Sequence, residues 1–247
     1  MNILSKVGVR VTILSLLLVG GCNATQGGNM ASSVLSAFGQ AQQGDALDEN
    51  TVVAGLKEAL TLGSERAVAS TSAKDGFWSN EKIKIPLPAE LNTAFSTLRS
   101  IGFGSQVDAL ELGMNRAAEQ ASVEAKPVLV DAVKGMSLSD AMGILRGGDT
   151  AATDYFRAQT SAPLKEKFLP IIQDKMGEVG LYQQYNKLMD AYTALPLTKE
   201  SGFNLDNYVA DKGLDGLFTM LGQEEQAIRA NPAARTTALL QKVFAPR

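Results

Sequence analysis

Three side chains that could carry acid–base chemistry recur at every fourth position of one segment. Glu111, Asn115 and Glu119 are spaced i, i+4 and i+8, and Arg116 lies beside them. On a helix this spacing places all three on one side. If that side faces water, it is a solvated helix face; if it faces the interior, the residues need polar partners and form a structural salt-bridge cluster. A carboxylate pair in a pocket, such as Glu111 and Glu119, is also the arrangement used by glycan-cleaving enzymes.

The stretch ILRGGDTAATDYFR could supply those partners from Arg146, Asp149 and Arg157. These residues are therefore weak candidates for a polar binding pocket with Asn115 and Arg116. Taken alone, the stretch resembles a phosphate loop, a metal site or a corner between two helices. Asp149 would repel an anion at the phosphate position, no P-loop lysine follows, and calcium ligands at alternate positions are lacking. We predict a corner, in which the two glycines end one helix through a left-handed turn and Asp149 or Thr150 caps the next helix.

The residue inventory excludes most familiar catalytic groups. The chain has no histidine and one cysteine, which leaves no histidine base, no histidine or thiolate zinc site and no disulfide within the chain. The segment SNEK, Ser79 to Lys82, matches the Ser-x-x-Lys of penicillin-binding proteins, but the partner motifs S-D-N and K-T-G are missing. We expect no metal and no cofactor.

Helical periodicity dominates the elements that must position these residues. The clearest helical faces are Val107, Leu110, Met114, Ala117 and Ala121, and Leu181, Tyr185, Leu188, Met189, Tyr192 and Leu195. Only IKIPL, residues 83–87, alternates like a strand, and Pro86 favours an extended loop there. The sequence predicts an all-α fold: an irregular bundle of about eight or nine helices with short connections.

Capping residues and prolines predict where helices begin. Ser105 with Asp108, and Ser137 with Asp140, place a capping hydroxyl three residues before an acid. Pro127 falls inside a helical pattern, and so does Pro170. Each of these prolines should start a new helix or bend one.

The first 22 residues predict export and a lipid anchor. Lys6 and Arg10 precede an apolar run too short to span a membrane, and two glycines precede Cys22. The segment LVGGC resembles the lipobox of bacterial lipoproteins, in which the cysteine is lipidated after the signal peptide, here residues 1–21, is removed. An aspartate after that cysteine commonly retains such proteins in the inner membrane, whereas this chain has Asn23. The resemblance implies an outer-membrane location, with the body facing the periplasm.

Composition divides the rest of the chain into a tether and one domain. Residues 22–51 are rich in Gly, Ser, Gln, Ala and Asn and read as a flexible tether. Residues 52–247 are long enough for a single helical domain with one core. The formal charge of −3 becomes −5 once Lys6 and Arg10 are removed. An acidic body argues against nucleic acid as a partner.

Several motifs together resemble a family of bacterial envelope lipoproteins known only as a domain of unknown function. That resemblance implies a helical domain and lipid anchoring in the cell envelope. No activity, ligand or catalytic residue is known for the family, so none can be assigned from it. The motifs, which span most of residues 52–247, are GLKEAL, IPLP, MNRAAE, ILRGGDTAATDYFR, ALPL and IRANPAARTTALLQKVF.

Two classes of function follow from these observations. The favoured one is a non-enzymatic interaction or ligand-binding module, held on the membrane by its N-terminal lipid and serving an envelope protein or ligand. The alternative is a carboxylate-dependent hydrolase of cell-wall glycan that uses Glu111 and Glu119. A closed polar cluster or an apolar groove would favour the first class. A cleft with two carboxylates at catalytic distance would favour the second.

Overall fold

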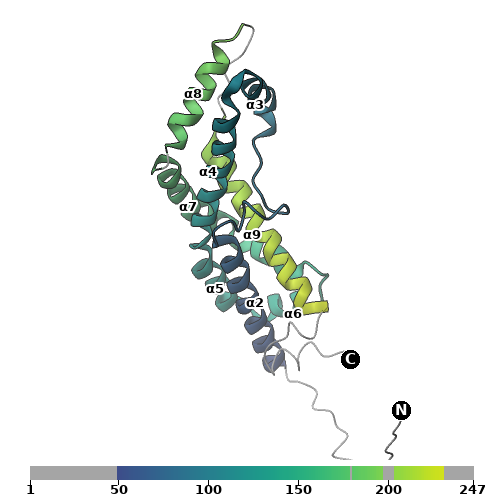
Figure 1. Ribbon diagram of the computed structural model, residues 1–247. Helices are drawn as coiled ribbons and strands as arrows, with labels where there is room; N and C mark the ends of the chain where they lie inside the picture. The colour runs from purple at the N-terminus through teal and green to yellow at the C-terminus, as the bar shows by residue number, and fades with distance from the viewer. Residues whose placement is uncertain (1–48, 179, 197–202, 231–247) are drawn as a thin grey trace, which may run out of the picture. The chain divides into compact units, whose positions relative to one another are not determined.

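A computed structural model describes residues 49–178, 180–196 and 203–230, and within these ranges every regular element is helical (Figure 1). The all-α prediction is therefore confirmed for this part of the chain. The elements are α2 (Glu49–Ser72), the 3₁₀ turn η1 (Ala89–Leu91), α3 (Asn92–Leu98), the π-helical turn η2 (Arg99–Phe103), α4 (Gly104–Ser122), α5 (Ala125–Gly135), α6 (Leu138–Arg146), α7 (Ala151–Glu178), α8 (Leu181–Thr193) and α9 (Leu205–Ala230).

Among the described residues, the predicted number of eight or nine helices is slightly too high when only helices of nine residues or more are counted. The described residues contain seven helices of nine residues or more, together with the seven-residue α3. Part of the difference lies in α7, which continues for 28 residues through Pro163 and Pro170. Pro170 therefore does not start a new helix, whereas Pro127 lies in the first turn of α5, where its missing N–H costs no helical hydrogen bond.

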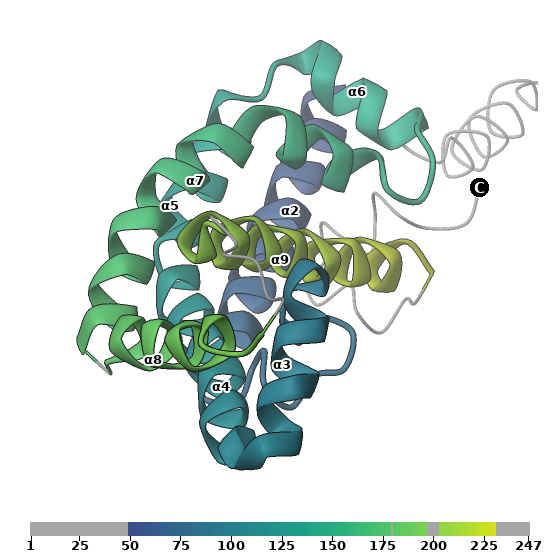
Figure 2. The same ribbon diagram turned by 90° about the horizontal axis from the view of Figure 1, so that it is seen from above.

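Helix α9 lies at the centre of the packing, against α7, α2 and α4 (Figure 2). Its Val209, Leu217 and Phe218 are at most 1% exposed. The predicted seam of α4, from Val107 to Ala121, is likewise buried. Burying such apolar side chains is the main favourable contribution to folding, at roughly 25 cal/mol per Å² of apolar surface.

One of the two predicted capping boxes forms. Ser137 accepts a hydrogen bond from the backbone N–H of Asp140, and Asp140 accepts one from the backbone of Ser137, which fixes the start of α6. The prediction for Ser105 is wrong, because α4 already begins at Gly104. The chain enters α4 directly from η2, where Gly102 has a φ of 100°, so Ser105 lies inside the helix and cannot cap it.

Several predictions concern residues outside the described ranges: the signal peptide at 1–21, Cys22, nearly all of the tether at 22–51, and the motif that follows Ala230. Helix α2 begins at Glu49, three residues before the predicted start of the domain at 52. Within the described ranges, no helix is both long enough and apolar enough to cross a membrane.

Candidate functional site

Glu111, Asn115 and Glu119 lie on the side of α4 that contacts the segment between α2 and η1. We call that segment, residues 73–88, the strap, and we call Glu111, Asn115 and Glu119 the ladder. Each ladder residue contacts the strap through its own partner. The ladder therefore faces a neighbouring segment of the same chain, not open solvent.

Glu119 is buried, with 3% of its surface exposed, and both carboxylate oxygens accept hydrogen bonds. Its Oε1 accepts from the backbone N–H groups of Phe77 and Trp78, at 3.1 and 3.3 Å. Its Oε2 accepts from Nη1 of Arg116 at 2.7 Å. These donors satisfy a carboxylate that would otherwise be costly to bury. Glu119 thereby fixes the beginning of the strap on α4.

Arg116 extends this cluster to the turn that leaves α2. Its Nη2 donates to Oδ1 of Asp75 at 2.6 Å. Asp75 has a φ of 67°, a left-handed conformation that aspartate adopts more readily than most residues. The hydrogen bond to Glu119 and the second one to Asp75 raise the pKa of Arg116 despite its partial burial. Arg116 is thus held in one position by two carboxylates.

Asn115 pairs with one backbone position of the strap. Its Oδ1 accepts from the N–H of Ile85 and its Nδ2 donates to the carbonyl of Ile85, both at 2.8 Å. Nδ2 also donates to the carbonyl of Glu111. Ile85 is 1% exposed, and this side chain supplies its backbone with the two hydrogen bonds that a neighbouring strand would otherwise provide. Within the IKIPL segment Ile83 accordingly closes a turn, and residues 84–87 have no regular secondary structure.

Glu111 is the most exposed member of the ladder, with 18% of its side chain accessible. Its Oε1 lies 3.5 Å from Nζ of Lys84, and the same ammonium lies 3.9 Å from the centre of the Trp78 ring. A cation over an indole face is attracted by the ring's electron density. Glu111 therefore contributes a polar contact at the surface end of the strap.

This geometry gives the ladder a structural role. Glu111 and Glu119 are eight residues apart on one helix, about 12 Å along its axis, and they contact different parts of the strap. Glycan-cleaving carboxylates stand roughly 5–9.5 Å apart across a substrate. Here the strap occupies the space in front of both groups. The ladder is a closed polar cluster that holds the strap against α4.

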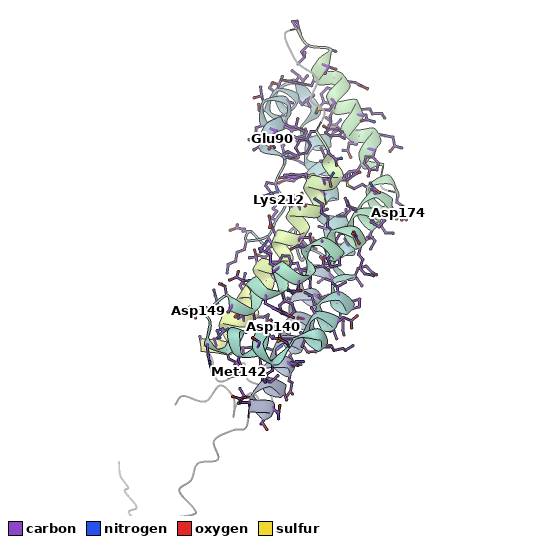
Figure 3. All side chains as sticks on the ribbon, turned by 180° about the vertical axis from the view of Figure 1, so that it is seen from behind. Glu90, Asp140, Met142, Asp149, Asp174 and Lys212 are labelled. Atoms are coloured by element: carbon purple, nitrogen blue, oxygen red, sulfur yellow. The ribbon has the colours of Figure 1, made fainter. Side chains whose placement is uncertain are left out.

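The remaining sequence-predicted candidates do not join the ladder. Arg157 donates to Asp215 of α9 at 3.1 Å and lies over the Phe218 ring. Arg146 and Asp149 are exposed at the end of α6 and just after it. Figure 3 shows Asp149 at that end of the helices, well apart from Glu90 beside α3. The partners of the ladder come instead from Arg116, Lys84 and the strap backbone.

The α6–α7 corner is fixed by two residues that the sequence reading missed. Glu225 of α9 accepts from the backbone N–H groups of Ala152 and Thr153, at 2.9 Å each, and from the Thr153 hydroxyl. A carboxylate there satisfies unpaired donors and the positive end of the α7 dipole. Arg229, one turn later, bonds to Glu225 and donates to the carbonyl of Ile144 in α6. The predicted corner between two helices is confirmed, but two details of it are wrong. Gly147 is extended (φ −76°, ψ 177°) and not left-handed, and the side chain that accepts from the first turn of α7 is Glu225 of α9, not Asp149 or Thr150.

On another side of α4, an open groove of about 290 Å³ lies between α4, the end of α7 and the start of α8. Helix α8 can approach α4 closely here because residue 113 is a glycine: a Cβ at this position would lie 2.0 Å from Leu181 Cδ1. Tyr182 holds the first turn of α8 against α9 by donating a hydrogen bond to Asp206 at 2.7 Å. Burial and this carboxylate raise the pKa of Tyr182. The groove is lined by Ala109, Leu112, Gly113, Arg116, Ala117, Gln120, Lys175, Glu178, Leu181 and Gln184.

Arg116 belongs to both features, because it lines the groove and bonds to the ladder and the strap. It is the one sequence-predicted candidate in the groove. Lys175, Gln120 and Gln184 were missed because their spacing carries no motif and they meet only after α7 and α8 fold back on α4. Among the described residues, no group of three or more carboxylates, histidines or cysteines is placed to hold a metal ion.

A family model described as "Protein of unknown function (DUF4197)" matches residues 46–245. That range covers both the ladder and the groove. No curated protein and no solved structure matches the chain.

Proposed function

Since the chain belongs to the DUF4197 family, whose description assigns no activity, we propose a function from its geometry: it is a non-enzymatic, ligand-binding or interaction module of the cell envelope. The proposal places the protein at the outer membrane, held by a lipid on Cys22, with its helical domain facing the periplasm. The sequence LVGGC followed by Asn23 supports the anchor and the location.

The observation that carries the proposal is the groove between α4, α7 and α8. Small-molecule sites in proteins are concave, mostly apolar and equipped with a few polar groups, at about 300–1,000 Å³. The groove, at about 290 Å³, lies just below that range and combines an apolar floor with Arg116, Lys175, Gln120 and Gln184. Glu111 and Glu119, which a hydrolase would need, are engaged with the strap. No observation favours the hydrolase alternative.

Site-specific photo-crosslinking in intact envelopes tests this proposal. A benzophenone amino acid replaces Gln120, which is exposed at the groove, and in a matched variant it replaces Gln159, which is exposed elsewhere on α7. We expect one discrete adduct from position 120 and none from position 159. Equal labelling from both positions, or no adduct from either, would overturn the groove as the binding surface.

The anchor is tested separately by growth in labelled palmitate. Label should enter the wild-type protein and should be lost in Cys22→Ala, which should also leave the membrane fraction. If Cys22→Ala retains both the label and the membrane association, the lipid anchor is wrong.

A further inference from the structure

We propose that Met220 is a modification site: hydrogen peroxide oxidises its thioether to a sulfoxide, and the sulfoxide loosens the strap from α9. This inference uses neither the groove nor the lipid anchor, so it stands apart from the proposed function. It rests on the exposure of Met220, on the two amides that contact its sulfur, and on the packing of the strap beside it.

Met220 lies where the strap crosses α9. Its side chain packs against the core and is partly exposed. Its sulfur accepts hydrogen bonds from Nδ2 of Asn80 in the strap and from Nε2 of Gln223, three residues later in α9, both at 3.6 Å. A small dissolved oxidant can reach a partly exposed methionine, whereas the 0% exposed Met114 and Met176 are shielded by the core.

Asn80 closes a turn of the strap, residues 80–84, and also joins that turn to Met220. Its Oδ1 accepts from the N–H of Lys82 at 3.1 Å. Its carbonyl accepts from the N–H groups of Ile83 and Lys84, at 3.0 and 2.8 Å. Because Nδ2 of the same residue donates to the sulfur of Met220, a change at that sulfur acts directly on the turn.

The sulfur has little room for an added oxygen on the side of the strap. A hydrogen bond to oxygen spans about 2.9 Å, so the N···S distance of 3.6 Å cannot hold an S–O bond followed by such a hydrogen bond. The strap as a whole cannot shift along α9, because the buried ring of Phe77 packs directly on Gly216, one turn before Met220. The displacement therefore falls on Asn80 and on the turn that it closes.

The reaction is a two-electron oxidation of sulfur. A lone pair of the thioether attacks one oxygen of hydrogen peroxide, the O–O bond breaks, and the sulfur keeps that oxygen. The other oxygen takes both protons of the peroxide and leaves as water, so the sulfur loses the two electrons that the peroxide gains. The product is polar, whereas the thioether is a weak acceptor on an apolar side chain.

The test treats the purified full-length protein with hydrogen peroxide and follows each methionine by peptide mass spectrometry. Met220 should gain one oxygen in the same period as Met142 and Met189, which are also partly exposed. Met114 and Met176 should remain reduced in that period.

Amide hydrogen exchange, measured by NMR, locates the effect of the oxidation. The amides of residues 82–84 should exchange about fivefold faster in the oxidised protein, which is the effect of losing about one hydrogen bond. The amides of Phe77 and Ile85 should keep their rates, because the ladder holds them from α4.

Three variants isolate the contact between Met220 and Asn80. Met220→Leu keeps an apolar side chain of similar volume and cannot be oxidised, so peroxide should no longer change exchange in the turn. Met189→Leu, the matched control at another partly exposed methionine, should leave the response intact. Asn80→Asp keeps the acceptor for the N–H of Lys82 but removes the amide donor, so exchange should be faster before peroxide is added and should not rise further.

The proposal is overturned if Met220 stays reduced while Met142 and Met189 are oxidised, or if the turn exchanges at the same rate in both states. It is also overturned if Met220→Leu still responds to peroxide. If exchange rises equally at Phe77 and Ile85, the oxidation destabilises the whole domain, and the assignment to the turn is wrong.

Discussion

Removing the carboxylate of Glu119 is the perturbation whose cost the structure specifies best. Glu119→Ala leaves the N–H groups of Phe77 and Trp78 without their acceptor, in a site where Phe77 is 0% exposed, and leaves Arg116 with Asp75 as its one carboxylate partner. A buried donor left unpaired costs about 1–3 kcal/mol, and the lost ion pair adds less than a fully buried pair would, because Arg116 is partly exposed and Asp75 still neutralises it. We therefore expect a loss of about 2–4 kcal/mol in the free energy of unfolding.

Urea denaturation followed by circular dichroism measures that loss, with Glu111→Ala as the matched control on the same face of α4. Glu111 has one longer, partly exposed ion pair, so its removal should cost less than about 1 kcal/mol. Glu119→Gln should fall between the two, because its amide oxygen can still accept from the strap. A loss below about 1 kcal/mol for Glu119→Ala, or equal losses for both alanine variants, would refute the structural reading of the ladder.

Three further predictions concern the rest of the domain. Glu225→Ala should cost about 3–5 kcal/mol and should speed amide hydrogen exchange in the first turn of α7, because two backbone donors lose their acceptor; unchanged exchange there would contradict this. Gly216→Ala should destabilise by about 1–3 kcal/mol, since its Cβ would lie 2.4 Å from a Phe77 ring carbon, whereas Gly143→Ala, with open space around it, should stabilise by about 0.5–1 kcal/mol; thermal melts give both signs. The hydrogen bonds from the Ser137 hydroxyl and backbone lower the pKa of Asp140 below its ordinary value of 3.8, so the stabilisation from this cap is present above pH 4 and is lost as the pH falls through the lowered pKa. Ser137→Ala should return that pKa toward 3.8 in an NMR titration, and an unchanged pKa would exclude this cause.

The helices could be predicted from sequence because their apolar residues recur with the helical period, and the α4 seam and the Ser137 cap were recognisable for that reason. The capping prediction for Ser105 failed because the preceding segment is itself helical. A local pattern of a hydroxyl three residues before an acid does not reveal whether the chain enters the helix from a loop or from another helix.

The residues that bond to these polar side chains could not be predicted from the sequence. The spacing of Glu111, Asn115 and Glu119 places them on one face of a helix, but a period does not say what that face contacts. The strap between α2 and η1 carries no strong periodicity, so nothing predicted that residues 73–88 would lie across the ladder. Likewise Glu225 is more than 70 residues from the helix start that it caps.

The groove was missed for a related reason. Its charged residues come from α4 and α7, and Gly113 has meaning only because Leu181 packs on it. From sequence alone, a glycine inside a helix predicts lower helix stability, whereas Gly113 here allows a neighbouring helix to pack closely.

The central claim is that the groove carries the function and the ladder carries the structure. Envelope photo-crosslinking from position 120 tests it most directly when combined with two further changes, Ala109→Trp in the groove and Glu111→Gln in the ladder. We predict that Ala109→Trp abolishes the adduct and that Glu111→Gln leaves it intact. An adduct that survives the filled groove but disappears with Glu111→Gln would contradict the account.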